Sequence, residues 1–482
     1  MADEQSDEVR PRRALVEETA SDAPYKPRRA LDPEDDPADK SRRQQRSKRA
    51  VVVGAVAALA AAGLATGYGV LTGPKAAGAG PEPAASASAA ASTSSPNAEP
   101  TQLTDAMAMS PEQAKEVDPD RSWRVALTQR ALDDQSPQAV CLDSADAQGA
   151  SQRVAAPQQS VVRVLSSSGQ QPPGLFHQAD AYATVQEARR AYEVRAKALG
   201  GCATPGAYLE SGYRVTGLGD QAVAAVVRVT TDTGSSEQRS VVLNRTGRLV
   251  NVADVAQTGA AVAVAKVAEA LAGVTTAQCG AADGRCSAAV TVTAGPPPPG
   301  GGQPGFLVGA DLPAVTGADT TWNPTVPAPP AADFAGSGCE RVNWAKTAAR
   351  HRAARTYLHG DPAVPFGLDE IVLTHASDSA ARGLVAQVKA DLDSCAKRKL
   401  TASVTPPSPV SGVGADGASV RGWTSTVKQQ TTAGVHTYRV GVVSAGKASV
   451  FTFLNPQPKL DLTDAQWAAV TVRAGQRASQ VP

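Results

Sequence analysis

The sequence predicts an α+β protein with two tandem homologous domains, each an antiparallel sheet with helices packed on it. One transmembrane helix and a disordered N-terminal tail precede these domains. Three observations lead to this prediction. The same landmarks recur in the same order in the two halves of the 482-residue chain. Predicted strands follow one another rather than alternate with helices, which is typical of an α+β fold, and an uncharged apolar stretch of 22 residues lies near the N-terminus.

The N-terminal region predicts a tail and a membrane anchor. Residues 1–49 combine proline with charges of both signs and show no apolar periodicity, so we expect them to be disordered. Residues 50–72 form the predicted transmembrane helix, because their uncharged stretch would measure about 33 Å at about 1.5 Å per residue. The basic cluster at 40–49 precedes this span. The positive-inside rule then places the N-terminus in the cytoplasm and the C-terminal domains outside the cell membrane.

Two other interpretations of residues 50–72 are a cleaved signal peptide and a buried soluble helix. A signal peptide would need a charged leader of 49 residues, and a soluble helix of this length rarely lacks charge. The basic cluster at 40–49 could bind nucleic acid, but beside a membrane span we expect contact with anionic lipid, worth about 1 kcal/mol per basic residue. The net charge of +1 gives no general basic surface, so we expect a membrane partner and no nucleic acid.

Two further features precede the domains. Thr19 and Ser21 lie in an acidic stretch of the tail and could be phosphorylated, although an unmodified tail is the simpler interpretation. Residues 73–101 are rich in Ala, Ser and Pro, which predicts a linker that tethers the domains to the span. Its Ser/Thr cluster could carry glycans, but a plain tether is the simpler interpretation.

Two copies of one pattern follow this linker. Residues 183–202 align with residues 376–395 without a gap, so a predicted helix ends at a cysteine in both copies. A tryptophan precedes another cysteine by 18 residues in the first copy and by 17 in the second (Trp123 to Cys141, Trp322 to Cys339). This order indicates an internal duplication. The predicted domains are residues 102–286 and 305–482, separated by a Pro/Gly linker at 287–304.

Each copy continues with the same predicted elements. Thr184 and Glu187 form a capping box at the start of the first central helix, and Ser377 holds the matching position in the second copy. Gly200 and Gly201 read as the stop of the first helix. Antiparallel hairpins follow at 239–255 and 436–453, with a glycine and a basic residue at each turn, Gly247-Arg248 and Gly446-Lys447. The closing helices are predicted at 259–273 and 462–474.

Six cysteines lie after the predicted span, and an even number in an oxidising compartment suggests disulfides. The duplication selects among the pairings because each copy has one matched pair. The remaining two cysteines lie in a short loop found only in the first copy. We therefore predict the disulfides Cys141–Cys202, Cys339–Cys395 and Cys279–Cys286. A metal site is the alternative, but CxxC pairs with nearby histidines are missing.

The sequence contains few signatures of catalysis. It has no HExxH motif and no GxSxG elbow. His351 and His359 are eight residues apart and would lie on roughly one face of a helix. Two solvated histidines are nevertheless a simpler interpretation than a pair of zinc ligands. Residues 441–449 fit the spacing of a phosphate-binding loop, but Ala448 replaces the Ser or Thr that would hold Mg²⁺ and a strand-like run follows, so we predict a hairpin turn. We predict no enzyme activity, no catalytic residues, no metal and no cofactor.

The paired Trp and Cys, the helix with Ala-Arg that ends in Cys, the GLGD-type turn at 217–220 and the late hairpin resemble one family. They are similar to the extracellular sensor domains of actinobacterial transmembrane Ser/Thr kinases, over residues 102–286 and 305–482. The resemblance implies an antiparallel sheet with helices on one face and a cleft for an unknown ligand. This chain departs from the family because 49 tail residues cannot hold a kinase domain. The resemblance assigns no ligand-binding residue, so these remain unknown.

The leading hypothesis is a single-pass, non-enzymatic sensor or ligand-binding protein of the cell envelope. Its tandem domains would bind an unknown envelope ligand or protein, such as a wall component, a lipid or a small molecule. Its tail would contact a cytoplasmic kinase or regulator. The alternative is an envelope scaffold without signalling, and the third is an extracytoplasmic hydrolase, for which no nucleophile and base are visible.

Overall fold

The computed structural model describes most of the chain after the predicted linker. The described residues are 102–130, 132–133, 135–142, 154–230, 235–315, 322–359 and 366–481. The predicted tail at 1–49, the transmembrane helix at 50–72 and the Ala/Ser/Pro linker at 73–101 lie outside these ranges. Within them, no helix combines the length and the apolar character needed to cross a membrane.

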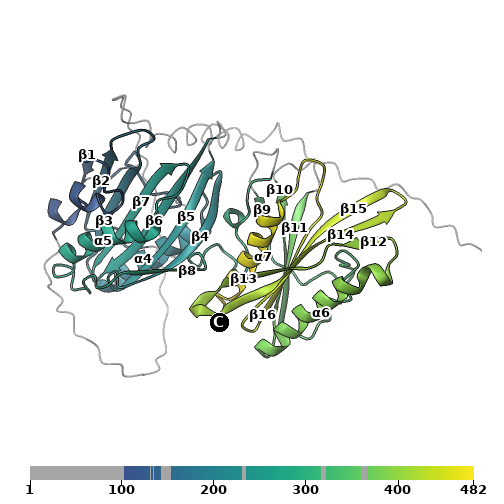
Figure 1. The fold of residues 1–482 in the computed structure, drawn as a ribbon. Helices are drawn as coiled ribbons and strands as arrows, with labels where there is room; N and C mark the ends of the chain where they lie inside the picture. The colour runs from purple at the N-terminus through teal and green to yellow at the C-terminus, as the bar shows by residue number, and fades with distance from the viewer. Residues whose placement is uncertain are drawn as a thin grey trace, which may run out of the picture. The chain divides into compact units, whose positions relative to one another are not determined.

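The first part of the described chain forms an eight-stranded antiparallel sheet with the order β1-β2-β3-β7-β6-β5-β4-β8 (Figure 1). Its strands are β1 (Trp123–Gln129), β2 (Gln159–Ser167), β3 (Gly174–Ala181), β4 (Ala207–Thr216), β5 (Gln221–Thr230), β6 (Ser236–Thr246), β7 (Leu249–Thr258) and β8 (Thr291–Gly295). Its helical segments are η2 (Asp105–Met107), α3 (Pro111–Ala114), α4 (Val185–Gly201) and α5 (Val264–Gln278).

The second part forms another antiparallel sheet with the order β9-β10-β11-β16-β15-β14-β12, and β13 also pairs with β14. Its strands are β9 (Trp322–Pro324), β10 (His351–His359), β11 (Gly367–Thr374), β12 (Ala402–Val404), β13 (Ser408–Val413), β14 (Ser419–Thr431), β15 (Gly434–Ala445) and β16 (Ala448–Leu454). Its helical segments are η4 (Gly309–Asp311), α6 (Asp378–Arg398), η5 (Ala415–Gly417) and α7 (Asp464–Ala478). The predicted α+β class with two antiparallel sheets is confirmed.

Seven strands of the two sheets follow the same order when each strand is replaced by its counterpart in the other copy, and β8 of the first sheet has no counterpart among the described strands of the second. Both begin at an edge strand that starts with a buried tryptophan, Trp123 or Trp322. Each indole N–H donates to a backbone carbonyl of the preceding segment, at 3.1 Å to Asp118 and at 3.0 Å to Pro313. The repeated landmarks of the sequence therefore occupy corresponding places in two sheets of one topology.

The helices cover both faces of each sheet, and this differs from the single face that the family resemblance implied. In the first sheet, Val241 on β6 shares a hydrophobic cluster with Leu199 of α4, whereas its neighbour Val242 shares one with Leu271 of α5. The second sheet repeats this alternation between α6 and α7. All seven residues of β16 are buried. A strand buried on both faces reads as a continuous run of apolar and small residues, as β16 does.

The capping box and the two hairpin turns are present as predicted. The Thr184 side chain accepts from the Glu187 N–H at 3.1 Å, and the Glu187 carboxylate accepts from the Thr184 N–H, which completes the capping box of α4. The two predicted hairpins are β6–β7 and β15–β16. Their turn glycines, Gly247 and Gly446, have φ values of 52° and 55°, in the left-handed region that favours glycine. The phosphate-loop spacing at 441–449 therefore falls on a hairpin, as predicted.

Other predicted elements differ in extent. The closing helices are α5 and α7, which extend further toward the C-terminus than predicted. The predicted linker at 287–304 contains β8, which pairs with β4 from Gly212 to Thr216 and adds a strand to the first sheet. His351 and His359 lie at the two ends of strand β10, so the helical face considered for them is wrong.

Gly200 and Gly201 are the last two residues of α4, so the predicted stop is confirmed, and Cys202 follows as the C-cap. Their function is close packing. A Cβ atom at Gly200 would overlap the carbonyl oxygen of Pro298, and a Cβ at Gly201 would approach the N–H of Gly301. The proline- and glycine-rich segment that follows β8 therefore passes directly over the end of α4.

This packing predicts that Gly200→Ala destabilises the protein. The added methyl group must displace a backbone carbonyl, and overpacking of this kind costs about 1–3 kcal/mol. Gly383→Ala is the matched control, because the Cβ position at Gly383 in α6 is open. Alanine there should raise the free energy of unfolding by up to about 1 kcal/mol. Urea unfolding of both variants checks this, and equal effects would contradict the packing role of Gly200.

Candidate functional site

The six cysteines pair as predicted, and none of them is free. The Cα atoms are 4.6 Å apart in Cys141–Cys202, 5.3 Å in Cys339–Cys395 and 4.9 Å in Cys279–Cys286. The two long-range disulfides join the cysteine in or just after the central helix to the segment between the first two strands of its sheet, β1 and β2 for Cys141 and β9 and β10 for Cys339. The predicted helix end at a cysteine holds for α4, which Cys202 directly follows, whereas α6 continues past Cys395 to Arg398.

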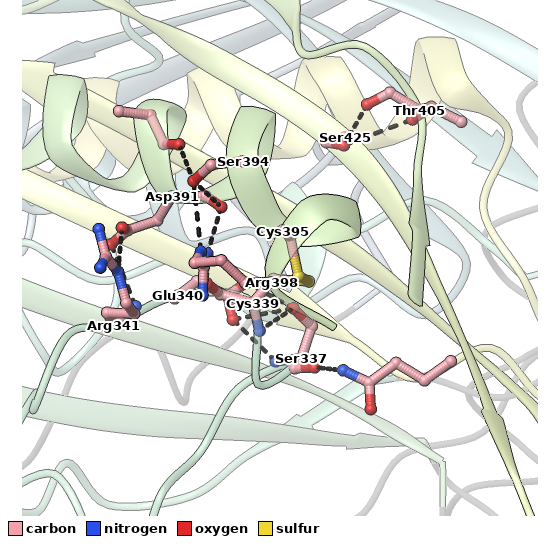
Figure 2. Close-up of a disulfide and its surroundings, with 12 residues drawn as sticks. Ser337, Cys339, Glu340, Arg341, Asp391, Ser394, Cys395, Arg398, Thr405 and Ser425 are labelled. Atoms are coloured by element: carbon pink, nitrogen blue, oxygen red, sulfur yellow. Dashed lines mark hydrogen bonds and ion pairs between the residues drawn. A yellow bond between two sulfur atoms is a disulfide. The ribbon is translucent and has the colours of Figure 1, made fainter. Parts of the chain in front are cut away.

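Polar contacts reinforce the disulfide of the second sheet (Figure 2). The Arg398 guanidinium donates to the carbonyl of Cys339 at 2.9 Å and to that of Asp391 at 2.6 Å. The buried Glu340 carboxylate accepts from the hydroxyl and the N–H of Ser337. These contacts fix the segment around Cys339 against α6. The site is a structural staple and contains no reactive thiol.

The described residues contain no cluster of three or more His, Cys, Asp or Glu side chains that could hold a metal ion. The histidines considered above are far from one another in strand β10. His351 is exposed, whereas His359 is buried and packs edge-on against Trp322 and Phe366 with ring centroids 5.7 Å away in both cases. His359 is therefore part of an aromatic cluster in the core, and the prediction of a solvated side chain is wrong for this residue.

A cleft of about 590 Å³ opens on the second sheet. Its floor is formed by Thr426 and Lys428 of β14 with Thr437 and Arg439 of β15. These side chains lie on the α7 face, because they alternate in step with Val420 and Val443, which pack under α7. The segment from Asn455 to Asp461 forms a wall. We call this site the Lys428 cleft.

The two basic side chains of the Lys428 cleft differ in their pairing with carboxylates. Arg439 donates two hydrogen bonds to the Asp461 carboxylate, at 2.6 and 2.9 Å. It donates a third, at 2.6 Å, to Asp464 at the start of α7. Its charge is thus neutralised. Lys428 is exposed, and none of the described carboxylates forms an ion pair with it. The cleft therefore presents one ammonium group beside threonine hydroxyls and the amides of Asn455 and Gln457.

The first sheet has different residues or contacts at the positions equivalent to this cleft. The turn alignment places Ser240 where the second sheet has Arg439, and the Ser240 hydroxyl donates to the carbonyl of Val262 at 2.6 Å. Arg228 takes the place of Lys428, and its guanidinium lies 5.1 Å from the centroid of the Tyr208 ring. The residues of the Lys428 cleft were not predicted. Comparison of the two hairpins in the sequence offered one signal, the replacement of Ser240 by Arg439.

Two buried titratable residues occupy equivalent positions in the central strands. His177 on β3 is opposite Ala253, and Glu370 on β11 is opposite the corresponding Thr452. Each accepts an N–H from the segment that precedes its sheet, His177 from Met109 at 3.4 Å and Glu370 from Leu307 at 3.1 Å. Burial lowers the pKa of His177 to about 4, and burial raises the pKa of Glu370 to about 8. Both side chains are therefore neutral near pH 6.

The neighbours of Glu370 suit a protonated carboxyl group. The Tyr357 hydroxyl lies within hydrogen-bonding distance of both Glu370 and the Leu307 carbonyl, the latter at 3.0 Å. A hydroxyl has one proton to donate. If Tyr357 donates to Leu307, a protonated Glu370 can donate to the Tyr357 oxygen, and both contacts of the Tyr357 hydroxyl are satisfied.

The raised pKa predicts how stability depends on pH. Between about pH 4.5 and pH 8 the folded protein holds a proton on Glu370 that the unfolded chain has released, so stability falls as the pH rises through this window. Glu370→Gln should remove this fall, because glutamine resembles the protonated carboxyl and does not titrate. Urea unfolding midpoints between these pH values check this. An unchanged slope in Glu370→Gln would contradict the assignment, and Asp393→Asn, at an exposed carboxylate, is the control.

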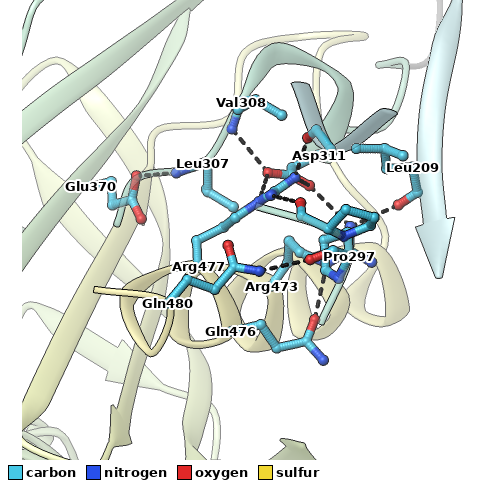
Figure 3. A network of polar contacts seen from close by, with 12 residues as sticks. Leu209, Pro297, Leu307, Val308, Asp311, Glu370, Arg473, Gln476, Arg477 and Gln480 are labelled. Atoms are coloured by element: carbon cyan, nitrogen blue, oxygen red, sulfur yellow. Dashed lines mark hydrogen bonds and ion pairs between the residues drawn. The ribbon is translucent and has the colours of Figure 1, made fainter. Parts of the chain in front are cut away.

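A second buried network ties α7 to residues of the first part of the chain (Figure 3). Asp311 accepts from Arg477 at 2.8 and 3.0 Å and from Arg473 at 2.9 Å. Arg477 also donates to the carbonyl of Gly200 at 2.7 Å, and Arg473 to that of Leu209 at 2.9 Å. Burial opposes the ionisation of Asp311, but the two guanidinium groups hold its pKa below the usual value. The network is structural, since its charges are enclosed.

Comparison with family models, curated proteins and solved structures finds no match to this chain.

Proposed function

We propose that this chain is a single-pass, membrane-tethered protein of the cell envelope whose extracytoplasmic domains bind a small anionic ligand without transforming it. The Lys428 cleft is the observation that carries this proposal. A concave site with a few convergent polar groups is the usual form of a ligand site. The three disulfides support an oxidising compartment, in agreement with the predicted span at 50–72 and the resemblance to kinase sensor domains.

The chemistry of the Lys428 cleft defines the ligand class. The lysine ammonium supplies a positive charge and three hydrogen-bond donors, which suit a carboxylate or phosphate. The surrounding threonine hydroxyls and the amides of Asn455 and Gln457 can donate to and accept from hydroxyl groups. We therefore expect a polar ligand that carries both an anionic group and hydroxyls, as an acidic sugar does.

The duplication and the tail complete the proposal. The first domain, which has Ser240 and Arg228 at the equivalent positions, would position the second and would not bind the same ligand. The tail at 1–49 would pass the bound state to a cytoplasmic kinase or regulator. The sequence resemblance supports this signalling arrangement.

An envelope scaffold remains the second candidate, and one observation favours it. Strand β1 pairs only with β2 in the described sheet, so its other edge has no strand partner there. Val125 and Leu127 on β1 are 42% and 39% exposed. An exposed edge with apolar side chains can accept an extended segment of a partner protein.

The Lys428 cleft predicts that glucose 1-phosphate and glucuronate stabilise the full chain, whereas glucose does not. A ligand that prefers the folded state raises stability by about 2.7 kcal/mol at about 100 times its Kd. Lys428→Ala should weaken this stabilisation about tenfold in ligand concentration, since the loss of one charged hydrogen bond is worth roughly 1.5–3 kcal/mol. Thermal unfolding in detergent measures the effect. Arg228→Ala, at the equivalent position of the first sheet, should change nothing, and equal effects of the two variants would refute the proposal.

A further inference from the structure

The α4 face of the first sheet contains two buried carboxylates. Asp180 on β3 and Asp254 on β7 are 0% and 1% exposed. Asp180 forms an ion pair with Arg195 of α4. Asp254 accepts from Arg239 of β6 at 2.6 and 3.0 Å. A core face that encloses two such ion pairs is unusual, because removing charges from water is costly.

The second sheet has apolar or aromatic residues at all of these positions. Alignment at the hairpin turns and at the central cysteines matches Asp180, Arg195, Asp254 and Arg239 with Leu373, Val388, Phe453 and Tyr438. Three of the four belong to one hydrophobic cluster, against which Tyr438 packs, and Tyr438 stacks on Phe453 with ring centroids 5.4 Å apart. The fold is thus built with an apolar face in the second copy. Stability does not require the ion pairs, since apolar packing at such sites is often equally or more stable.

The ion pairs of the first sheet lie beside a cavity of about 170 Å³, which we call the Arg195 cavity. Arg195 and Gln178 line one side of it, and residues of the segment from Leu132 to Leu142 line the other. Asp254 helps to hold this segment in place, because it accepts the N–H of Val140 at 2.8 Å. The Cys141–Cys202 disulfide fixes the same segment to the end of α4.

The polar groups that line the Arg195 cavity include both hydrogen-bond donors and hydrogen-bond acceptors. Arg195 contributes its guanidinium, whose Nη1 atom is buried without a hydrogen-bond partner among the described residues. Gln178 binds Asp180 through its amide nitrogen at 2.8 Å, so its carbonyl oxygen is left as an acceptor. Asp133, which is exposed, contributes a carboxylate. The volume equals that of about six water molecules, enough for a compact ligand only.

We propose that the Arg195 cavity is a second binding site, which takes a small zwitterionic amino acid. The carboxylate of the ligand binds the Arg195 guanidinium, and its ammonium group binds Asp133 and the Gln178 carbonyl. The cavity admits only a short side chain. The proposal does not rest on the Lys428 cleft, which lies on the other sheet and favours a ligand with net negative charge.

Calorimetric titration of the full chain with glycine and with alanine tests this site. We expect binding in the range up to about 50 mM, weak by the standards of protein ligands, and no binding of acetate or methylamine, which each have only one of the two charges. Asp133→Asn should weaken binding about tenfold. This variant keeps the oxygen that accepts the N–H of Gln135 at 2.9 Å, so the turn is retained. Asp120→Asn, at another exposed aspartate, is the matched control and should have no effect.

A second variant guards against an indirect effect on folding. Gln178→Ile introduces the residue type found at the equivalent Ile371 of the second sheet and should also weaken binding, while the protein keeps a single cooperative thermal transition. Lys428→Ala should leave amino-acid binding intact, which separates this site from the proposed ligand cleft. The absence of binding by glycine and alanine, equal binding of acetate, or unchanged affinity in both cavity variants would overturn the proposal and leave a cavity filled with water only.

Discussion

Replacing Asp311 by alanine is expected to lower the free energy of unfolding by about 3–5 kcal/mol. The loss is large because the two arginines that pair with Asp311 are buried. Arg473 and Arg477 are 7% and 1% exposed, so the variant would leave two guanidinium groups buried without their carboxylate. The N–H of Val308, which donates to Asp311 at 2.9 Å, would lose its acceptor as well. Urea unfolding followed by tryptophan fluorescence measures the loss, because four of the five tryptophans lie after residue 320.

A charge-free version of this network provides the control. The triple variant that also replaces Arg473 and Arg477 by methionine should regain part of the lost stability, since no unpaired charge is then buried. Asp464→Ala, at the exposed carboxylate that Arg439 contacts, should cost less than about 1 kcal/mol. A loss below about 1 kcal/mol in Asp311→Ala would contradict the description of this network as a buried ion cluster.

Removal of the Cys339–Cys395 disulfide is expected to cost about 4 kcal/mol. The bond closes a loop of 56 residues, and in the chain-entropy model it stabilises mainly by restricting the unfolded chain. Both cysteines are fully buried. The double variant Cys339→Ala/Cys395→Ala should therefore unfold at a much lower urea concentration. The wild type in the presence of a reductant should unfold at a still lower urea concentration, because the reductant can open the other two disulfides as well.

The Cys279–Cys286 disulfide is the internal comparison. Its sequence separation is 7, and Cys286 is exposed. The same model gives a smaller loss of about 2–3 kcal/mol for the corresponding double alanine variant. If the two double variants lose equal stability, loop length does not determine the contribution of these bonds, and the structural role assigned to the matched pairs is wrong.

Much of the fold could be predicted from the sequence because its signals are local or repeated. The capping box at Thr184, the glycine turns at Gly247 and Gly446 and the alignment of Cys202 with Cys395 each depend on residues close in sequence or on the duplication. The cysteine pairing followed from that alignment. The role of Gly200 did not, because its neighbour Pro298 is nearly a hundred residues away.

The ligand sites could not be predicted in the same way. Lys428 and Thr437 come from facing strands and belong to one site only because the β14–β15 register pairs them. Arg195 and Gln178 meet where a helix crosses a sheet, and no sequence spacing encodes that crossing. The useful signal was a difference between the copies. Positions that are charged in one copy and apolar in the other, such as Asp254 and Phe453, mark places where packing alone does not explain the residue.

The most direct test of the central claim, that the second sheet binds an anionic ligand at the Lys428 cleft, is a methyl NMR spectrum of the threonine-labelled protein during titration with glucose 1-phosphate. The claim predicts that the signals of Thr405, Thr426 and Thr437, which line the cleft, shift together and saturably. These shifts should be lost in Lys428→Ala, and threonine signals of the first sheet should not move. Saturable shifts in the first sheet, or none at the three cleft threonines, would contradict it.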